Sequence, residues 1–419
     1  MNRPNTNRRK FLQFSAASVA LAGTSTVSLG KNSESMAKEK KQDITSVVDV
    51  LVVGGGTAGT VAAIQAGRSG AKTMVLERHS QLGGTMTTGG VAFPGLFDAW
   101  GKQIIGGVGW ELVKESVELD GGWLPDFSKV PGRHWQNQIH LNQFLYSILA
   151  EEKCEEAGVK IAYYEFPQEV KKTANGWEVE CVGFGTKRKV ICKQIVDCTG
   201  GAEVVGLMGH ERLRGEERQP GSYLFQMENP HKPAKGQLDR LYVHGADSTN
   251  SRTVTEANLT GRKAILAKVR KSKKKLMHLQ PETGFRESCR IIGETIITVN
   301  DYTSGKVFDD AIGYAFYPVD LHTKTGVKPK PLKPGVIPTI PLSALIPKNS
   351  QNVIVAGRCI SSDRLANSGL RVQASCMSMA QAAGVTAAIG AKKNLTPLKV
   401  PLSEIRAELQ AHNAILPKV

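Results

Sequence analysis

Apolar runs with two different periods, one typical of strands and one of helices, alternate near the start of the chain. Residues 47–53 form a β-branched run of the kind that lies buried in a parallel sheet. After a glycine-rich turn, an Ala-rich stretch with Val61 and Ile64 on one face predicts a helix over 60–68. A second strand is predicted over 72–77. This order of strand, glycine turn, helix and strand predicts a Rossmann-like βαβ unit.

The same reading applies to the middle of the chain. Apolar spacing predicts an amphipathic helix over 141–156 with five side chains facing inward, namely Leu141, Phe144, Leu145, Ile148 and Leu149. A strand over 159–164, a hairpin over 169–182 and an apolar strand over 193–198 follow. The alternation of helices and strands therefore continues for about a further 50 residues.

These patterns predict an α/β fold with a parallel sheet and a β-hairpin insert, in a discontinuous domain of residues 46–210 and 341–395. The second part supplies a strand that begins at Val353 and then an Ala-rich helix. Residues 211–340 lack this alternation, so we expect a smaller α+β substrate domain there. Residues 396–419 are expected to form a C-terminal tail.

The first 37 residues are expected to be an export signal and not part of the fold. Paired Arg8 and Arg9, followed by Phe11-Leu12 and a mildly apolar stretch, resemble a twin-arginine signal. Small residues at 20–22 and at 35–37 offer two alternative cleavage sites. A basic N-terminus without a role is the competing interpretation. The prediction is a periplasmic or otherwise exported protein, with the twin-arginine export machinery as a partner.

Composition fits a globular protein, with 41% hydrophobic and 22% charged residues. No apolar run is as long as the roughly 18 residues that a membrane span needs. The net charge is +16, of which residues 1–37 contribute +4 from five basic and one acidic side chains. This charge suits an anionic small-molecule substrate, but no nucleic-acid-binding motif accompanies it. The seven cysteines include no CxxC pair, so no metal site is predicted and most are expected to be buried.

A basic stretch over 262–275 predicts a helix with four apolar side chains facing inward, namely Ile265, Leu266, Val269 and Leu276. Such a helix could contact the surface of an anionic membrane. A solvated helical face is the interpretation that we favour.

The glycine turn has the spacing GxGxxG and comprises Gly54, Gly55, Gly56, Thr57, Ala58 and Gly59. Gly54 permits the tight turn, Gly56 lets the backbone approach a pyrophosphate, and Gly59 lets helix and strand pack closely. The free N–H groups of the helix start would face the phosphates. Glu77, at the end of the second strand, is placed to accept hydrogen bonds from ribose hydroxyls, and its charge disfavours a 2′-phosphate.

The segment after Glu77 indicates which dinucleotide is bound. It runs from Arg78 to Leu82-Gly83-Gly84-Thr85 and resembles the flavoprotein side of the two-dinucleotide-binding superfamily. That resemblance implies FAD, with a second glycine loop near the pyrophosphate. The strand that ends at Thr199-Gly200 resembles the strand that returns beside the cofactor in glutathione-reductase-like FAD domains. No second GxGxxG stands between a strand and a helix, so an NAD(P)H domain is not expected.

The C-terminal block makes the resemblance specific. It comprises Ala356-Gly357-Arg358-Cys359-Ile360-Ser361, then Leu370-Arg371-Val372, then a Cys-Met helix with Gln381-Ala382-Ala383-Gly384. This block, with stretches 286–294 and 317–322, closely resembles the family of FAD-dependent oxidoreductases. The likeness extends over residues 49–392 and departs at Cys289 and Gly201, where arginine and aspartate are common. It implies that Gly357 and Arg358 lie near the pyrophosphate or ribityl chain, and that 371–375, including Val372 and Gln373, lies near the flavin ring.

A flavin oxidoreductase moves a hydride between its substrate and flavin N5 and needs an acid or base for the accompanying proton. His322, two residues after Asp320, is the first candidate for that base. Asp320 is expected to polarise the site, while Arg286, Arg290 or Arg371 could hold an anionic group. Two alternatives stay open: a non-redox isomerase or lyase in which FAD is a spectator, and a binding protein with a vestigial site.

Overall fold

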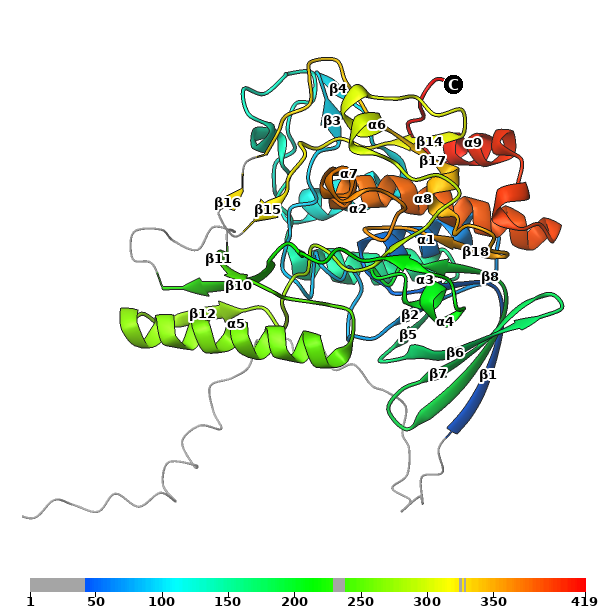
Figure 1. Ribbon diagram of the computed structural model, residues 1–419, viewed down its shortest axis with the longest axis horizontal. Helices are drawn as coiled ribbons and strands as arrows, with labels where there is room; N and C mark the ends of the chain where they lie inside the picture. Colours follow the sequence, from blue (N-terminus) through cyan, green and yellow to red (C-terminus); the bar gives the residue numbers. More distant parts are fainter. Residues whose placement is uncertain (1–41, 229–237, 324–325, 328) are drawn as a thin grey trace, which may run out of the picture. The chain divides into compact units, whose positions relative to one another are not determined.

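The computed structural model describes residues 42–228, 238–323, 326–327 and 329–419. Its main sheet has seven strands in the order β5-β2-β1-β8-β7-β6, with β18 also paired to β8 (Figure 1). Their bounds are β1 Gln42–Val53, β2 Thr73–Glu77, β5 Lys160–Tyr163, β6 Phe166–Thr173, β7 Gly176–Val182, β8 Thr186–Asp197 and β18 Val353–Val355. The chain therefore has the predicted α/β fold with a hairpin insert, and the sheet is mixed. The predicted signal lies outside the described residues.

The long strand β8 explains how parallel and antiparallel strands share one sheet. Its first half pairs antiparallel with β7 of the β6–β7 hairpin, from Lys187 to Cys192. Its last residues pair parallel with β18, where Val353 lies opposite Ile195. On its other edge, β8 pairs parallel with β1. The other side of β1 pairs parallel with β2, and β2 with β5. The carboxyl ends of five parallel strands, β1, β2, β5, β8 and β18, therefore lie at one edge of the sheet, which is where α/β folds place their ligands.

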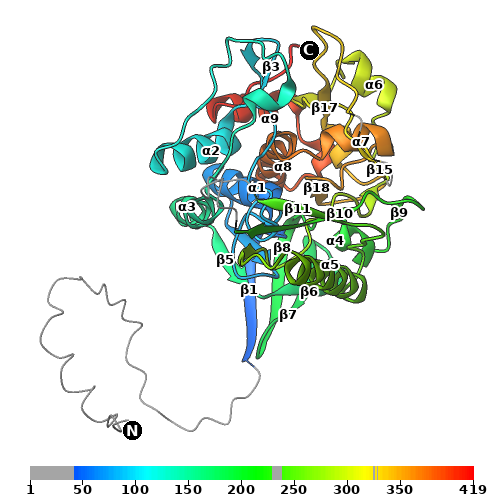
Figure 2. The ribbon, with the colours of Figure 1, turned by 90° about the vertical axis from the view of Figure 1, so that its left-hand side faces the viewer.

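The side chains of β1 alternate between two apolar layers, as the period of a strand requires. Val50 and Val52 face a layer that contains the helices α1 (Thr57–Arg68) and α8 (Gln373–Lys393). Leu51 and Val53 face the opposite layer. A Cβ on Gly384 would lie 2.5 Å from the carbonyl oxygen of Ala62, so the glycine allows α8 to touch the backbone of α1. The two helices lie against each other in Figure 2.

Outside the main sheet, β11 (Asp239–Val243), β10 (Gly221–Met227) and β12 (Leu276–Leu279) form a second, antiparallel sheet packed against the long helix α5 (Ser251–Ser272). The predicted basic helix is present as part of α5, but its predicted buried face is partly wrong. Ile265 is buried, but Leu266 is exposed and Leu276 lies in β12. Ala257 and Gly261 complete the buried stripe, because Gly261 packs directly against the ring of Tyr223.

The helix predicted over 141–156 is α3, Gln143–Glu156, and its predicted face is also partly wrong. Phe144 is 60% exposed and Ile148 is 63% exposed, whereas Tyr146 and Leu149 are buried. The buried stripe also contains Ala150 and Cys154, two small residues that let the helix pack closely. The spacing of apolar residues partly favoured the exposed face of α3, because large apolar residues lie on both faces of this helix.

The remaining elements are short and connect these layers. The helices are α2 Gly107–Leu119, α4 Glu203–Leu207, α6 Val299–Ser304, α7 Arg364–Leu370 and α9 Leu402–Ala411, with 3-10 turns at His134–Asn137, Leu342–Leu345 and Pro397–Lys399. The strands are β3 Asp98–Ala99, β4 Lys102–Gln103, β9 Arg212–Leu213, β13 Arg290–Ile291, β14 Ala311–Tyr314, β15 His322–Thr323, β16 Gly326–Val327 and β17 Thr339–Pro341. All seven cysteines are buried and unbridged. Within the described ranges, no helix is long and apolar enough to cross a membrane.

Candidate active site

A cavity of about 490 Å³ opens at the carboxyl ends of β1, β2 and β8. Its volume lies within the range of roughly 300–1,000 Å³ that is usual for small-molecule sites. Seventeen of the predicted site residues line it. They are Gly54, Gly56, Thr57, Ala58, Glu77, Arg78, Gly84, Thr85, Thr199, Gly200, Asp320, His322, Gly357, Arg358, Arg371, Val372 and Gln373. The fold therefore brings together residues from segments more than 300 positions apart.

The three glycines of the first turn differ in what a side chain would meet. Gly54 has φ +92°, and a Cβ on Gly59 would lie 1.7 Å from the carbonyl oxygen of Gly54. These two glycines serve the turn and the packing of helix on strand. At Gly56 the nearest atom to an added Cβ is the Cα of Gly84, 3.9 Å away. Gly56 therefore borders open space inside the cavity, as expected where backbone approaches a ligand.

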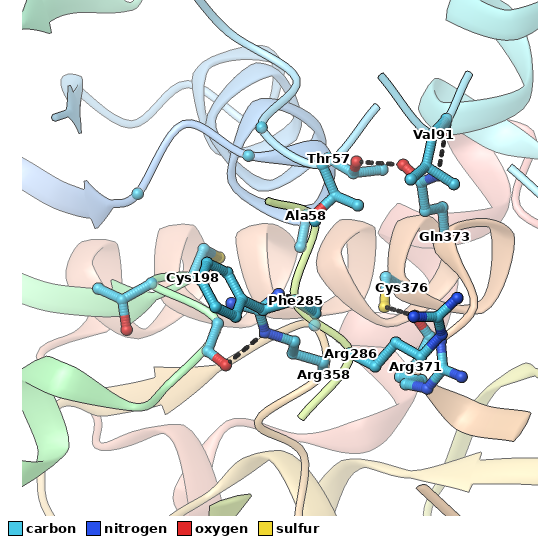
Figure 3. A pocket seen from close by; sticks show the side chains of 18 of the residues that line it. Thr57, Ala58, Val91, Cys198, Phe285, Arg286, Arg358, Arg371, Gln373 and Cys376 are labelled. Atoms are coloured by element: carbon cyan, nitrogen blue, oxygen red, sulfur yellow. Dashed lines mark hydrogen bonds between the residues drawn. The ribbon is translucent and has the colours of Figure 1, made fainter. Parts of the chain in front are cut away.

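The second glycine loop lies directly against the first. The N–H of Gly83 donates to the carbonyl of Gly55 at 2.9 Å, and Gly83 itself does not line the cavity. The hydroxyl of Thr57 lies 3.0 Å from the carbonyl oxygen of Gly83 and 2.8 Å from Oε1 of Gln373. Gln373 is the first residue of α8, and its amide donates to the carbonyl of Val91 (Figure 3). Side chains thus join the starts of α1 and α8 across the cavity.

Glu77 is buried at the end of β2, and its carboxylate is already partly engaged. One oxygen accepts from the N–H of Gly55 at 2.8 Å, and the other accepts from the N–H of His79 at 2.9 Å. The ring of His79 bridges Glu77 at 3.0 Å and Glu282 at 3.2 Å. Burial alone would lower the pKa of His79, but the hydrogen bonds to Glu282 and Glu77 raise it to about 9. No sequence motif predicts this bridge, since Glu282 comes from a distant segment.

Arg358 crosses the middle of the cavity wall. Its Nε donates to the carbonyl of Gly200 at 2.8 Å and its Nη1 to the carbonyl of Phe285 at 2.7 Å (Figure 3). The hydroxyl of Thr199 donates to Asp197 at 2.7 Å, which fixes the turn at the end of β8. Arg358 therefore ties the end of β8 to the loop before β13, with its positive charge against the cavity.

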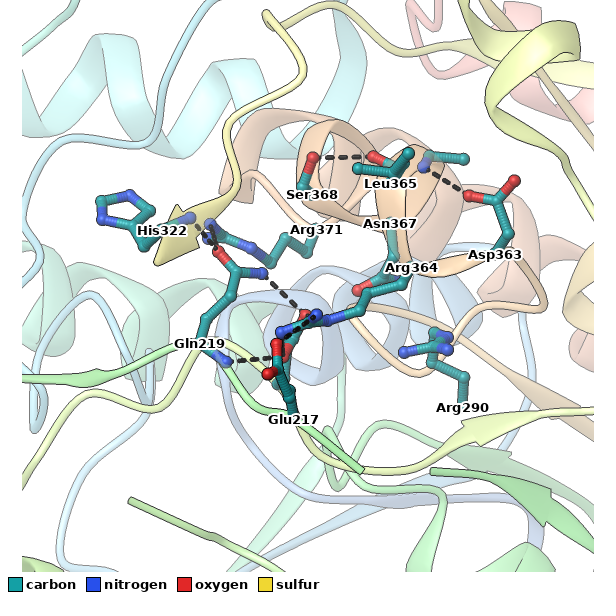
Figure 4. A network of polar contacts seen from close by, with 12 residues as sticks. Glu217, Gln219, Arg290, His322, Asp363, Arg364, Leu365, Asn367, Ser368 and Arg371 are labelled. Atoms are coloured by element: carbon teal, nitrogen blue, oxygen red, sulfur yellow. Dashed lines mark hydrogen bonds and ion pairs between the residues drawn. The ribbon is translucent and has the colours of Figure 1, made fainter. Parts of the chain in front are cut away.

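The other end of the cavity contains the predicted catalytic pair. Nε2 of His322 lies 3.0 Å from Oδ2 of Asp320, and Arg371 lies 3.8 Å from the same oxygen. Gln219 accepts from the N–H of His322 and from Nη2 of Arg371 (Figure 4). Because Nε2 faces the carboxylate, the hydrogen-bond pattern assigns the ring proton to Nε2 and leaves Nδ1 as the acceptor. Nδ1 is buried and has no partner among the described residues.

The electrostatics of this pair favour a neutral histidine beside a charged carboxylate. Burial lowers the pKa of His322; Asp320 opposes this shift, and the positive charge of Arg286 adds to it. Burial alone would raise the pKa of Asp320, but His322 and the charges of Arg371 and Arg286 hold it below its ordinary value. Near neutral pH, His322 can accept a proton at Nδ1.

Arg290, a predicted catalytic residue, does not line the cavity. Its Nε donates to the carbonyl of Ser362 at 3.0 Å, so it braces the segment before α7. Arg286 occupies the cavity wall instead, with its guanidinium over the ring of Tyr242 at 5.4 Å. Tyr242 and Gln219 carried no motif in the sequence, because their roles depend on contacts between separate segments.

The residues at the first end of the cavity fit a bound dinucleotide. Open space beside Gly56 gives a phosphate access to the backbone. Neither α1 nor α8 has a side-chain cap at its start, so N–H groups in the first turn of α1 are available to an anion. At the start of α8, the N–H of Ala374 already donates to the carbonyl of Pro94 at 2.8 Å. No cluster of metal-binding side chains exists in the described parts of the chain.

Sequence comparison agrees with this fit. The chain belongs to the family of FAD dependent oxidoreductases, whose family model matches residues 49–272 and 224–409. It is therefore a flavoprotein, with FAD as its cofactor.

Two curated relatives match smaller parts of the chain. Pseudooxynicotine dehydrogenase of a Pseudomonas species is 29% identical over 189 residues, which are 44% of this chain and 32% of that protein. Thiamine thiazole synthase of Methanococcus vannielii is 49% identical over 49 residues, 12% of this chain and 19% of that protein. The chain thus spans about a third or less of the length of these relatives.

Solved structures resemble the chain more distantly. Anhydrotetracycline hydroxylase OxyS from Streptomyces rimosus is 14% identical, with a TM-score of 0.47 over 86% of this chain and 65% of that chain. A flavoprotein/dehydrogenase from Cytophaga hutchinsonii is 14% identical, with a TM-score of 0.46 over 88% and 84%. At these scores the likenesses add nothing to the family assignment.

Proposed function

We propose that this FAD-dependent oxidoreductase transfers a hydride between a small-molecule substrate and its flavin. The observation that carries the proposal is one continuous cavity, lined by two glycine loops at one end and by the His322–Asp320 pair at the other. When bound, FAD supplies a two-electron acceptor or donor at N5. The chain has to position the substrate and handle its proton.

In this proposal His322 is the general base or acid. Its neutral ring accepts the substrate proton at Nδ1, while Asp320 holds Nε2–H and stabilises the positive charge that forms. Gln219 fixes the backbone of His322 and the side chain of Arg371. Gln219 is itself held by Glu287, through its backbone N–H at 2.7 Å and its side-chain amide at 2.9 Å. The base thus rests on a chain of buried contacts that limits its movement.

We propose further that the sheet and its hairpin form an FAD domain of the glutathione-reductase type, and that residues 211–340 form a smaller substrate domain. The second sheet with α5 supports this division, because it has an apolar cluster of its own that includes Tyr223, Phe225 and Ile265. Residues of this segment, among them Ser222, Tyr242 and Phe285, line the substrate end of the cavity.

The test is the spectrum of the purified protein. Flavin absorbance that follows the protein is expected first, and anaerobic addition of hydroxy acids, amines and sugars should then identify a compound that bleaches it. Bleaching that a His322→Gln variant loses while it retains FAD would support hydride transfer with His322 as the base. The opposite result is an enzyme that converts one of the compounds while its flavin stays oxidised throughout. That result would identify FAD as a spectator and overturn the proposal.

We also propose that the enzyme is exported folded by the twin-arginine route, on the strength of the Arg8-Arg9 motif. This route would carry the protein with its flavin already bound. Replacing both arginines by lysine should retain the protein in the cytoplasm of a producing bacterium, as measured by cell fractionation. Unchanged export of the Lys-Lys variant would refute the proposal.

A further inference from the structure

The substrate end of the cavity contains two partly buried arginines beside one carboxylate. Arg286 and Arg371 both line it, and Asp320 is the acidic side chain that lies beside them. Burial, with the positive charge of Arg371 next in importance, lowers the pKa of Arg286 to about 9. Figure 3 shows both guanidinium groups beyond the start of α8. Two like charges in a desolvated wall are costly unless a third group neutralises them.

Other nearby acids do not supply that neutralising charge. Glu287 is engaged by Arg364 at 3.0 Å and by Gln219 at 2.7 Å. Asp320 already accepts from His322 and is 3.8 Å from Arg371. Arg240 also lines this end and adds a further positive charge. With His322 neutral, the described residues leave an excess of positive charge here.

The hydrogen-bonding capacity of the two arginines is only partly used. Arg286 donates from Nη1 to the carbonyl of Pro220 at 2.6 Å and from Nη2 to Ser222 at 2.9 Å. Arg371 donates from Nη2 alone, to Gln219 and to the carbonyl of Asp320, each at 3.3 Å. Its Nε is buried without a partner among the described residues. A buried donor that lacks a partner in a ligand cavity points to an acceptor on the ligand.

We propose that Arg286 and Arg371 bind a carboxylate of the substrate, so that the enzyme acts on an organic acid. This inference rests on the proposed function and specifies its substrate class. The planar forks of two guanidinium groups match the two oxygens of a carboxylate. Asp320 disfavours a dianionic phosphate at the same place, because its own negative charge stands beside Arg371.

The experiment measures binding in the FAD-loaded enzyme, without turnover. Acetate, benzoate and succinate, their neutral amides, and inorganic phosphate are titrated while the visible flavin spectrum and the melting temperature are recorded. Carboxylates should shift the spectrum or raise the melting temperature in a saturable way, and the amides should not. Arg286→Gln and Arg371→Gln should each weaken carboxylate binding about ten- to hundredfold. Arg371→Lys should recover part of the loss.

The control is Arg252→Gln on the exposed start of α5, which should bind carboxylates as the unchanged enzyme does. Retained flavin absorbance and melting temperature in each variant show that it folds. Three results would each overturn the proposal. The amides could bind as well as the carboxylates, phosphate could bind more tightly than the carboxylates, or Arg286→Gln and Arg371→Gln could both leave carboxylate binding unchanged. Bleaching by neutral alcohols or amines alone would overturn it too, while the proposed hydride transfer would stand.

Discussion

The two ends of the cavity are built from different parts of the chain. The dinucleotide end is formed largely by main chain: two glycine loops and the starts of α1 and α8, which the side chains of Thr57 and Gln373 join. The substrate end consists of side chains, with Arg286, Asp320, His322 and Arg371 held by contacts between separate segments. A main-chain site is encoded locally, whereas a side-chain site depends on how the whole fold packs. The first kind can therefore be shared across a family, and the second can change with the substrate.

The largest effect should come from a methyl group at Gly59. A Cβ there would lie 1.7 Å from the carbonyl oxygen of Gly54 and 3.2 Å from Cβ of Cys198. Backbone cannot yield to that overlap, so Gly59→Ala should destabilise the fold by about 3 kcal/mol or more. The yield of soluble protein and the thermal unfolding temperature of the variant measure this loss of stability. A variant that melts as the original does would show that α1 can shift away from β1.

Gly56→Ala separates ligand binding from folding at the same turn. The added methyl meets no protein atom closer than 3.9 Å, so the unfolding temperature of the flavin-free protein should change little. The methyl occupies space expected for the pyrophosphate, and FAD affinity should fall about tenfold or more. Fluorescence titration with FAD measures this affinity. Unchanged FAD affinity would place the pyrophosphate elsewhere.

At the opposite end, His322→Gln should leave the flavin bound and remove the base. General acid–base catalysis typically contributes about 10²–10⁴-fold, so kcat should fall by that factor while flavin absorbance per protein stays constant. His210→Gln is a matched control, because His210 lies outside the cavity and its side chain makes no hydrogen bond to any of the described residues. Equal kcat values for the two variants would remove His322 from the chemistry.

The pH profile should distinguish a base from a merely structural histidine. The pKa of His322 lies below 6.5, chiefly because of burial, so the free base predominates at neutral pH. For substrate oxidation, kcat/KM should therefore be flat near pH 7 and fall in acid, as His322 becomes protonated. Asp320→Asn removes the partner that raises the pKa of His322, so the acidic limb should move to lower pH. A limb that stays in place would contradict the pairing of Asp320 with His322.

The same contrast explains what the sequence could predict. The turn at Gly54–Gly59, the hairpin and the order of the main-sheet strands were predicted correctly, because local periodicity and glycine spacing determine them. The early starts of β1 at Gln42 and of β8 at Thr186, and the strands of the second sheet, were not predicted. The faces of α3 and α5 were partly wrong, since Phe144 and Leu266 are as apolar as the residues that are buried. The sequence does not distinguish Arg290 from Arg286, because both lie in the same family-matched stretch, 286–294. Only the packing of the fold turns Arg286 toward the cavity.

The smallest expected effect concerns His79, a side chain at the dinucleotide end. His79 bridges Glu77 of β2 and Glu282, and its pKa in the folded protein is about 9 against an ordinary 6.5. A raised pKa stabilises the fold fully below pH 6.5, and this contribution is lost as the pH rises through about 9. His79→Gln should therefore lower the melting temperature most near pH 6.

The difference between the two proteins should narrow toward pH 10, where the histidine is neutral in both the folded and the unfolded chain. Melting temperatures of the FAD-loaded original and variant, measured at one-unit steps from pH 6 to 10, follow that difference directly. His210→Gln again serves as the control for the loss of a histidine outside the cavity. If the His79→Gln difference does not change with pH, the bridge to Glu282 carries no charge.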